Sequence, residues 1–212
     1  MLIKDLVKYI LKVVTPPSIC TFRLGKRDKK SILLTFDDGP SPKHTSQVMD
    51  VLEEFDAKAL FFMIGSRAEK NPTLVNEVLK RGHQIGNHSF SHPLGRLSFS
   101  QWVEEMQKCQ ESLFRLTGVY PKWFRPVRGD ITLSVLLAAR QCELRMMHWT
   151  LNTEDYGHLG NQTMASLTRN FIERIKDRSI VLAHDDHDIT GEFLKVVLPK
   201  IRSMDYELRS VG

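Results

Sequence analysis

Short apolar runs alternate along the chain with longer segments in which apolar residues recur every three or four positions. The runs predict buried strands, and the helical spacing predicts amphipathic helices that cover them. Strands are expected at 31–36, 59–64, 84–88, 122–125, 144–149, 180–183 and 206–211, and helices at 45–55, 72–80, 100–118, 132–140, 163–175 and 191–201.

The alternation itself predicts the fold class. Strands separated by helices indicate βαβ units and a parallel sheet. About seven strands within 212 residues favour an α/β fold, a distorted (β/α) barrel that is closed or nearly closed, with an open doubly wound sheet as the alternative. In both architectures the chemistry gathers at the carboxyl ends of the strands. We expect one such domain over residues 25–212, preceded by an extension over residues 1–24.

The N-terminal extension has a pattern of its own. Its apolar residues sit at helical spacing, which predicts an amphipathic helix. Charges such as Lys4, Lys8 and Lys12 interrupt the apolar residues, so the segment does not read as a standard signal peptide, and the localisation stays open. Packing on the domain is favoured over contact with a membrane surface.

Composition narrows the class of protein without changing this picture. Hydrophobic residues make up 42% of the chain and charged residues 26%, as in soluble globular proteins. The net charge of +5 is spread along the chain, so nucleic-acid binding is not expected. The three cysteines have neither metal-ligand spacing nor the pattern of a disulfide framework. We expect a monomer.

The most unusual polar feature is Thr-Phe-Asp-Asp-Gly-Pro at 35–40, which follows an apolar run and ends in a turn signal. Burial and mutual repulsion both disfavour two ionised carboxylates at the end of a buried strand. Asp37 and Asp38 therefore call for a metal ion, an arginine or a proton as partner. The plain alternative is a pair of solvated turn aspartates.

A pair of histidines offers such a partner. His88 and His92 follow the third expected strand, and imidazoles four positions apart can converge on one cation. Ser89 stands where zinc metalloproteases carry a glutamate, and Pro93 disfavours their helix. Two imidazoles and one aspartate from the first strand make a common arrangement for a catalytic zinc.

These two motifs, in this order, resemble those of the polysaccharide deacetylases with the NodB homology domain (carbohydrate esterase family four), and among them most those of the chitin deacetylases. The resemblance covers the chain from about Ser31 onward. It implies a NodB-like barrel and metal-dependent hydrolysis of N-acetyl groups from N-acetylglucosamine polymers or oligomers, with release of acetate. Two alternatives remain: a catalytically impaired homologue that binds metal and carbohydrate, and a deacetylase of peptidoglycan or of another N-acyl amide.

The resemblance also implies roles for the two motifs described above. Asp38, His88 and His92 match the metal ligands of the family. The metal is expected to be Zn²⁺, with Co²⁺ as the alternative. Asp37 matches the general base, which would act on a water that the metal has made more acidic.

Further roles are implied in the second half of the chain. Arg125 would pair with the base and hold it ionised. The backbone N–H of Arg128 would help to hold the oxyanion. His184 matches the general acid, tuned by Asp155, and Leu182 would line the pocket for the acetyl methyl group.

Four positions depart from the family pattern. Val127 replaces a proline, and Arg128 replaces a tyrosine, where it would either grip an anionic sugar or lie across the opening and exclude a polymer. Asn152 replaces an aspartate, and Tyr156 a tryptophan. These changes predict an altered substrate preference. The polar run 185–188 is expected to be a solvated loop rather than a second metal cluster.

Overall fold

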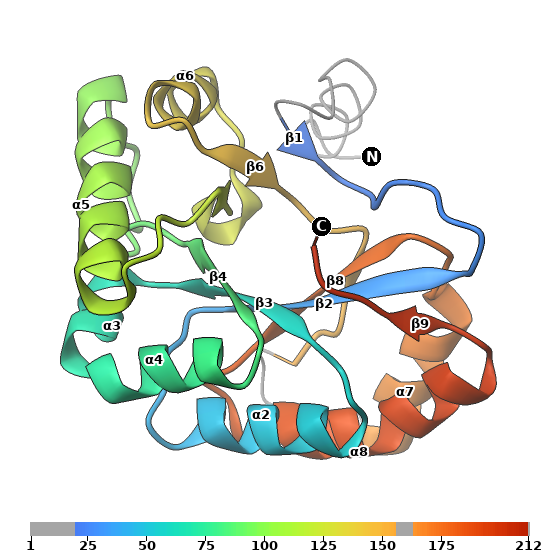
Figure 1. Ribbon diagram of the computed structural model, residues 1–212. Coiled ribbons are helices and arrows are strands. Elements are labelled where there is room, and N and C mark those ends of the chain that lie inside the picture. The colour runs from blue at the N-terminus through green and yellow to red at the C-terminus, as the bar shows by residue number, and fades with distance from the viewer. Residues whose placement is uncertain (1–19, 156–162, 212) are drawn as a thin grey trace.

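A computed structural model describes residues 20–155 and 163–211 of the chain (Figure 1). The helix expected within residues 1–24 lies almost wholly outside these residues. The strands are β1 (Cys20–Thr21), β2 (Ser31–Asp37), β3 (Ala59–Met63), β4 (Gln84–Asn87), β5 (Trp123–Phe124), β6 (Arg145–Met147), β7 (Leu151–Asn152), β8 (Ser179–His184) and β9 (Glu207–Leu208).

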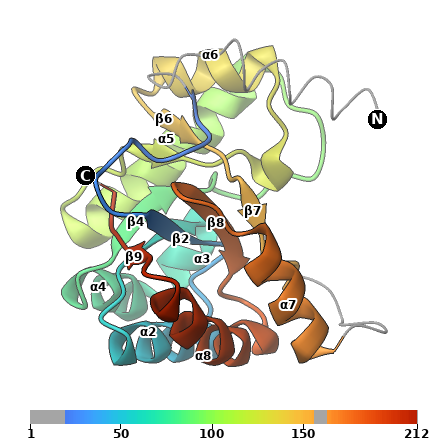
Figure 2. The same cartoon turned by 90° about the vertical axis from the view of Figure 1, so that its right-hand side faces the viewer.

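Helices lie on the outside of the curled sheet (Figures 1 and 2). Helices α2 and α8 pack against each other below the sheet in Figure 1, while α3, α4 and α5 cover its left side. The helices are α2 (His44–Glu54), α3 (Gly65–Lys70), α4 (Pro72–Lys80), α5 (Phe99–Thr117), α6 (Leu133–Gln141), α7 (Met164–Arg174) and α8 (Asp188–Ser203), with one 3₁₀ turn, η1 (Val127–Gly129). Within the described residues, no helix is both long and apolar enough to cross a membrane.

The nine strands form one parallel sheet in the order β1-β6-β5-β4-β3-β2-β8-β7, with β9 paired beside the start of β2. The ends of this order, β1 and β7, are not paired with each other, so the curled sheet is an incomplete barrel. This architecture confirms the predicted distorted α/β barrel. Strand β2 lies between β3 and β8, and all of its residues are buried.

Strand side chains alternate between two apolar clusters. Leu33, Leu60 and Phe62 belong to a cluster on the inner face of the sheet, which contains no helix residue. Their neighbours Leu34 and Phe61 belong to the larger cluster that packs against the helices. Because strand side chains alternate in direction, Asp37 points to the same inner face as Leu33.

Two strands and one helix were not anticipated. Strands β1 and β7 have two residues each, too few for an alternating pattern to appear in the sequence. Helix α3, with six residues, is likewise shorter than a recognisable helical pattern. The sheet therefore has more strands than the seven expected, but the predicted order of strands and helices is retained.

Helix ends follow local signals in some places and tertiary contacts in others. Helix α5 starts one residue before the predicted Ser100, because Ser98 and Gln101 form a reciprocal capping box. It ends at Gly118 as predicted, with a left-handed φ of 71°. The sequence offers Thr45 or Ser46 as the cap of α2, but the cap position is Lys43. Thr45 is buried within the helix, and its hydroxyl accepts from the Ser41 N–H at 2.8 Å.

Candidate active site

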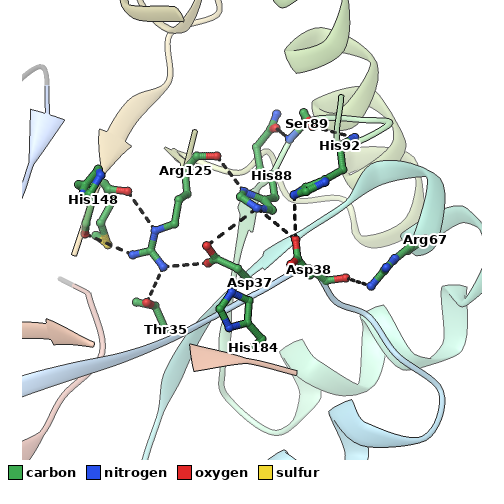
Figure 3. Close-up of polar contacts among 12 residues, drawn as sticks. Thr35, Asp37, Asp38, Arg67, His88, Ser89, His92, Arg125, His148 and His184 are labelled. Carbon is green, nitrogen blue, oxygen red and sulfur yellow. Dashed lines mark hydrogen bonds and ion pairs between the residues drawn. The ribbon is translucent and has the colours of Figure 1, made fainter. Parts of the chain in front are cut away.

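Polar side chains converge where strands β2, β4 and β8 end, on one edge of the sheet (Figure 3). Asp37, the last residue of β2, is the register partner of His184, the last residue of β8. Partners in a parallel sheet project to the same face, so this carboxylate and this imidazole lie side by side. Both are buried.

Arg125 is fully buried and binds Asp37 through its side chain. The distance between Arg125 Nη1 and Asp37 Oδ1 is 2.8 Å, and the same nitrogen donates to the Thr35 hydroxyl at 2.6 Å. Burial lowers the pKa of Arg125, and the charge of Asp37 opposes that shift.

Three further contacts hold the rest of the Arg125 guanidinium. Nε donates to the Met147 carbonyl at 3.1 Å, and Nη2 donates to the His148 carbonyl at 3.3 Å. The guanidinium also lies 4.2 Å from the Phe62 ring centroid. This fork of contacts fits arginine and not lysine.

A second group is formed by Asp38, His88 and His92. Asp38 Oδ1 lies 3.3 Å from His88 Nε2 and 3.2 Å from His92 Nε2. This oxygen is buried, yet it makes no hydrogen bond of good geometry. Burial would raise the pKa of Asp38, but the adjacent His88 and His92 imidazoles outweigh this effect and lower that pKa strongly. One ligand atom from each residue lies within 4.8 Å of the others, the only such group in the described part of the chain.

The tautomer of His88 suits it to ligate a cation. Its Nδ1 lies 2.8 Å from the Arg125 carbonyl oxygen, which can only accept, so Nδ1 carries the proton in the neutral ring. The lone pair of Nε2 then faces Asp38. Metal-ligating histidines usually make such a hydrogen bond through the other ring nitrogen. An orphaned carboxylate oxygen with two imidazole nitrogens around it thus fits a divalent cation such as zinc.

The backbone at this group is unusual and is held by a contact that the sequence did not suggest. Asp38 and His92 have left-handed φ angles of 73° and 55°, which are uncommon for residues other than glycine. Arg67 of α3 donates to the Asp38 carbonyl and, at 2.8 Å, to the Asp186 carboxylate. Arg67 therefore ties the loop after β2 to the loop after β8.

His184 is held on its far side by Asp155. Asp155 Oδ1 lies 2.8 Å from His184 Nδ1, and Oδ2 accepts from the His184 N–H at 2.8 Å. The Thr190 hydroxyl also donates to Oδ2, a contact that sequence reasoning missed. Burial would lower the pKa of His184, but Asp155 in the first place, with Asp37 and Asp38, raises it to about 9. His184 is therefore protonated at neutral pH.

The remaining candidate residues lie around these two groups. Arg128 is exposed in η1, and Leu182 is buried in β8. Val127 is buried in an apolar cluster, which anchors the turn that carries Arg128. The Asn152 side chain accepts from the Glu154 N–H at 2.9 Å and so shapes the turn that leads to Asp155. Tyr156 lies outside the described residues.

The expectation that residues 185–188 form a solvated loop is wrong at its first position. Asp185 is fully buried, and its Oδ2 accepts from the Thr45 hydroxyl. Burial raises its pKa to about 7. The last residue of this polar run, Asp188 at the start of α8, is exposed, with 76% of its side chain accessible. Asp185 packs against the Gly39 backbone, where a Cβ would lie 2.3 Å from its Oδ2.

Comparisons with known proteins agree with this site and fold. The family model described as polysaccharide deacetylase matches residues 24–147. A peptidoglycan-N-acetylglucosamine deacetylase of Bacillus cereus is 33% identical over 204 residues, which cover 95% of each chain. The crystal structure of the Bc1960 peptidoglycan N-acetylglucosamine deacetylase superposes with a TM-score of 0.81 at 28% identity and covers 95% of this chain and 93% of that one. The chain belongs to the polysaccharide deacetylase family.

Two further matches set limits on what the likeness shows. The peptidoglycan-N-acetylglucosamine deacetylase PgdA of Listeria monocytogenes is 34% identical over 98% of this chain, which spans only 44% of the Listeria protein. The fold is shared with BA3943 of Bacillus anthracis, described as a family pseudoenzyme, at 23% identity and a TM-score of 0.80. Fold alone therefore does not establish turnover. The Bacillus cereus and Listeria deacetylases are named for peptidoglycan, and neither is named for chitin.

Proposed function

We propose that this chain hydrolyses N-acetyl amides on a peptidoglycan-type glycan in a metal-dependent reaction that releases acetate and leaves a free amine on the sugar. One observation carries the proposal. Asp37, paired with Arg125, and His184 stand side by side on adjacent strand ends, next to the Asp38 group (Figure 3). Asp155 binds the His184 ring from the other side. A base, an acid and a cation-binding group are thus within reach of one substrate bond. We assign the catalytic unit to residues 25–212, with residues 1–24 as an extension.

The cation would be held by Asp38, His88 and His92, with zinc the expected ion and cobalt the alternative. When bound, it supplies polarisation of the amide carbonyl and activation of water. The remaining chemistry belongs to the side chains of the chain itself.

Asp37 acts as the general base. Its Oδ1 is occupied by Arg125, which leaves Oδ2 to accept a proton from the attacking water. Oδ2 faces the metal group, at 3.9 Å from His88 Nε2. The oxygen of the water forms the new bond to the carbonyl carbon and ends in acetate.

His184 acts as the general acid. As the bond between carbonyl carbon and nitrogen breaks, the protonated imidazole gives its proton to the departing amine. Asp155 keeps the ring charged and oriented until that step. The backbone N–H of Arg128 stabilises the negative charge that develops on the carbonyl oxygen, and Leu182 contacts the acetyl methyl group.

We take peptidoglycan as the first candidate substrate because the Bacillus cereus and Listeria relatives are named for it. This choice replaces chitin, which the sequence motifs alone favoured, as the first candidate. A wall polymer as substrate implies that the protein works at the cell surface or in the wall.

The test measures acetate released from peptidoglycan fragments and from N-acetylglucosamine oligomers, with zinc or cobalt added. Release from peptidoglycan that is lost in Asp37→Asn supports the proposal. Asp50→Asn, an exposed aspartate in α2, is the matched control and is expected to keep full activity. A wild-type protein that binds one metal ion and releases acetate from neither substrate would instead be the impaired homologue.

A further inference from the structure

Arg128 reaches from one site loop to the other. It lies in η1, three positions after Arg125, and its Nη2 donates to the Leu94 carbonyl at 3.0 Å. Leu94 in turn lies two positions after His92. The side chain therefore spans the solvent side of the site, between the loop that carries Arg125 and the loop that carries His92.

The backbone of Arg128 is specialised for this placement. Its φ of 53° is left-handed, a conformation that arginine seldom adopts. The next residue, Gly129, packs so closely under Trp149 that a Cβ there would lie 2.4 Å from the indole. The packing of Gly129 against Trp149 thus fixes the turn, and the Arg128 side chain points toward solvent.

The Arg128 guanidinium keeps most of its hydrogen-bonding capacity. Its side chain is 56% exposed, and beyond the Leu94 carbonyl its polar neighbour among the described residues is the Asp130 carboxylate, 3.9 Å away. An arginine has five N–H donors in a planar fork. Arg125, by contrast, is buried and uses its fork within the protein. Arg128 is therefore a charged group available to a ligand at the rim of the site.

The chemistry of this rim favours a carboxylate. The planar fork of arginine matches a carboxylate with two parallel hydrogen bonds. Leu94, 71% exposed beside it, offers apolar surface to a sugar ring or a short aliphatic substituent. Peptidoglycan strands carry carboxylates on their lactyl and peptide substituents, whereas N-acetylglucosamine oligomers carry none.

We infer that Arg128 is a specificity-determining residue that binds a carboxylate of the glycan, so that the site prefers carboxylate-bearing N-acetylated glycans over neutral ones. This inference rests on the proposed function and deepens it, since it names the substrate group that the site recognises, a carboxylate. The charge of Arg128 acts on the substrate and is separate from its backbone N–H, which every substitution except proline retains.

The test compares two substrates of equal length, a peptidoglycan fragment with free carboxylates and a neutral N-acetylglucosamine oligomer. The readout is the ratio of their kcat/KM values, so that any loss common to both cancels. Arg128→Gln is expected to lower this ratio at least about tenfold, mainly through KM, because a charge-assisted hydrogen bond is lost. The ratio for Arg128→Lys is expected to lie between those of the wild type and Arg128→Gln. Raising the salt concentration to about 0.5 M is expected to reduce the wild-type ratio, because salt screens exposed charges.

Arg115→Gln, which removes the same charge at the end of α5, is the matched control and is expected to leave the ratio unchanged. An unchanged or increased ratio in Arg128→Gln would overturn the inference, and an increase would mean that the side chain blocks the opening. The dissociation constants of both fragments are also measured in Asp37→Asn with and without Arg128→Gln. These dissociation constants measure the carboxylate preference in the absence of turnover. If the wild type releases no acetate, the proposed function is overturned, but the carboxylate preference is still tested by binding.

Discussion

Residue Arg125 is joined to His88 through its backbone and to Asp37 through its side chain. The Arg125 carbonyl accepts from His88 Nδ1 at 2.8 Å, while the guanidinium binds Asp37 Oδ1 at the same distance. One buried residue thus positions both a proposed metal ligand and the proposed base. The two links are chemically independent, so they can be separated by substitution.

Arg125→Lys is expected to lower kcat at least about 100-fold, the low end of what a positioned general base contributes. Lysine cannot reproduce the planar fork that binds Asp37, Thr35 and two carbonyls. Metal affinity is expected to change little, because the carbonyl that orients His88 remains. Steady-state kinetics and calorimetric metal titration check the two parts. Arg145→Lys, at an exposed position of β6, is the control, and a parallel loss of metal affinity and kcat would refute the separation.

Asp155→Asn is expected to shift the alkaline limb of the pH–rate profile to lower pH by at least about one unit. His184 must be protonated to act as an acid, and Asp155 is the main cause of its pKa of about 9. A bound cation would offset the part of this pKa increase that is due to Asp38. The part due to Asp155 persists, so the alkaline limb still shifts to lower pH. Thr190→Val should give a smaller shift than Asp155→Asn, since it removes one hydrogen bond that holds Asp155 in place but leaves its charge. An alkaline limb that stays in place in both variants would show that His184 is not the acid.

Removal of the metal is expected to abolish acetate release and to lower Tm. A cation that binds only the folded state at 100 times its dissociation constant adds about 2.7 kcal/mol of stability. His92→Ala should lose this metal-dependent rise in Tm, measured by calorimetry with and without a chelator. His44→Ala, in which a histidine bound to Asp188 is removed, should keep it. A metal-dependent rise that survives in His92→Ala would place the cation elsewhere.

Asp185→Asn is expected to change how stability depends on pH. The pKa of Asp185 is raised on folding from 3.8 to about 7, so the folded state favours the protonated acid. The stability from this group is complete below pH 4 and is lost as pH rises to about 7, by a few kcal/mol at most. The variant lacks this loss and should therefore gain relative to wild type between pH 4 and 7. Urea denaturation across that range measures the difference, and curves that stay parallel would contradict it.

The sequence was sufficient for the parts of the site that lie in short local patterns. Asp38, His88 and His92 stand in two motifs, and the structure brings them into one group. The succession of most strands and helices along the chain also follows from periodicity, because the apolar runs are long enough to show it.

The parts that sequence reasoning missed depend on contacts between distant segments. Arg67 and Thr190 carry no local signal in the sequence. The two partners of Arg67 lie 29 and 119 positions away, and the partner of Thr190 lies 35 positions away. Asp185 was misassigned because a polar run normally lies in solvent, whereas in the folded chain Thr45 of α2 supplies a buried partner. Burial of polar groups is decided by the tertiary structure.

Strand β2 ends in Asp37 and has hydrogen-bonded neighbours on both sides, β3 and β8. A strand in that position cannot fray without separating two others, so local opening is suppressed there. The backbone amides of Phe36 and Asp37 should therefore exchange with deuterium only as fast as the whole domain unfolds. The proposed base is thus held in place between turnovers, and any motion needed to admit a polymer must come from the loops that surround it.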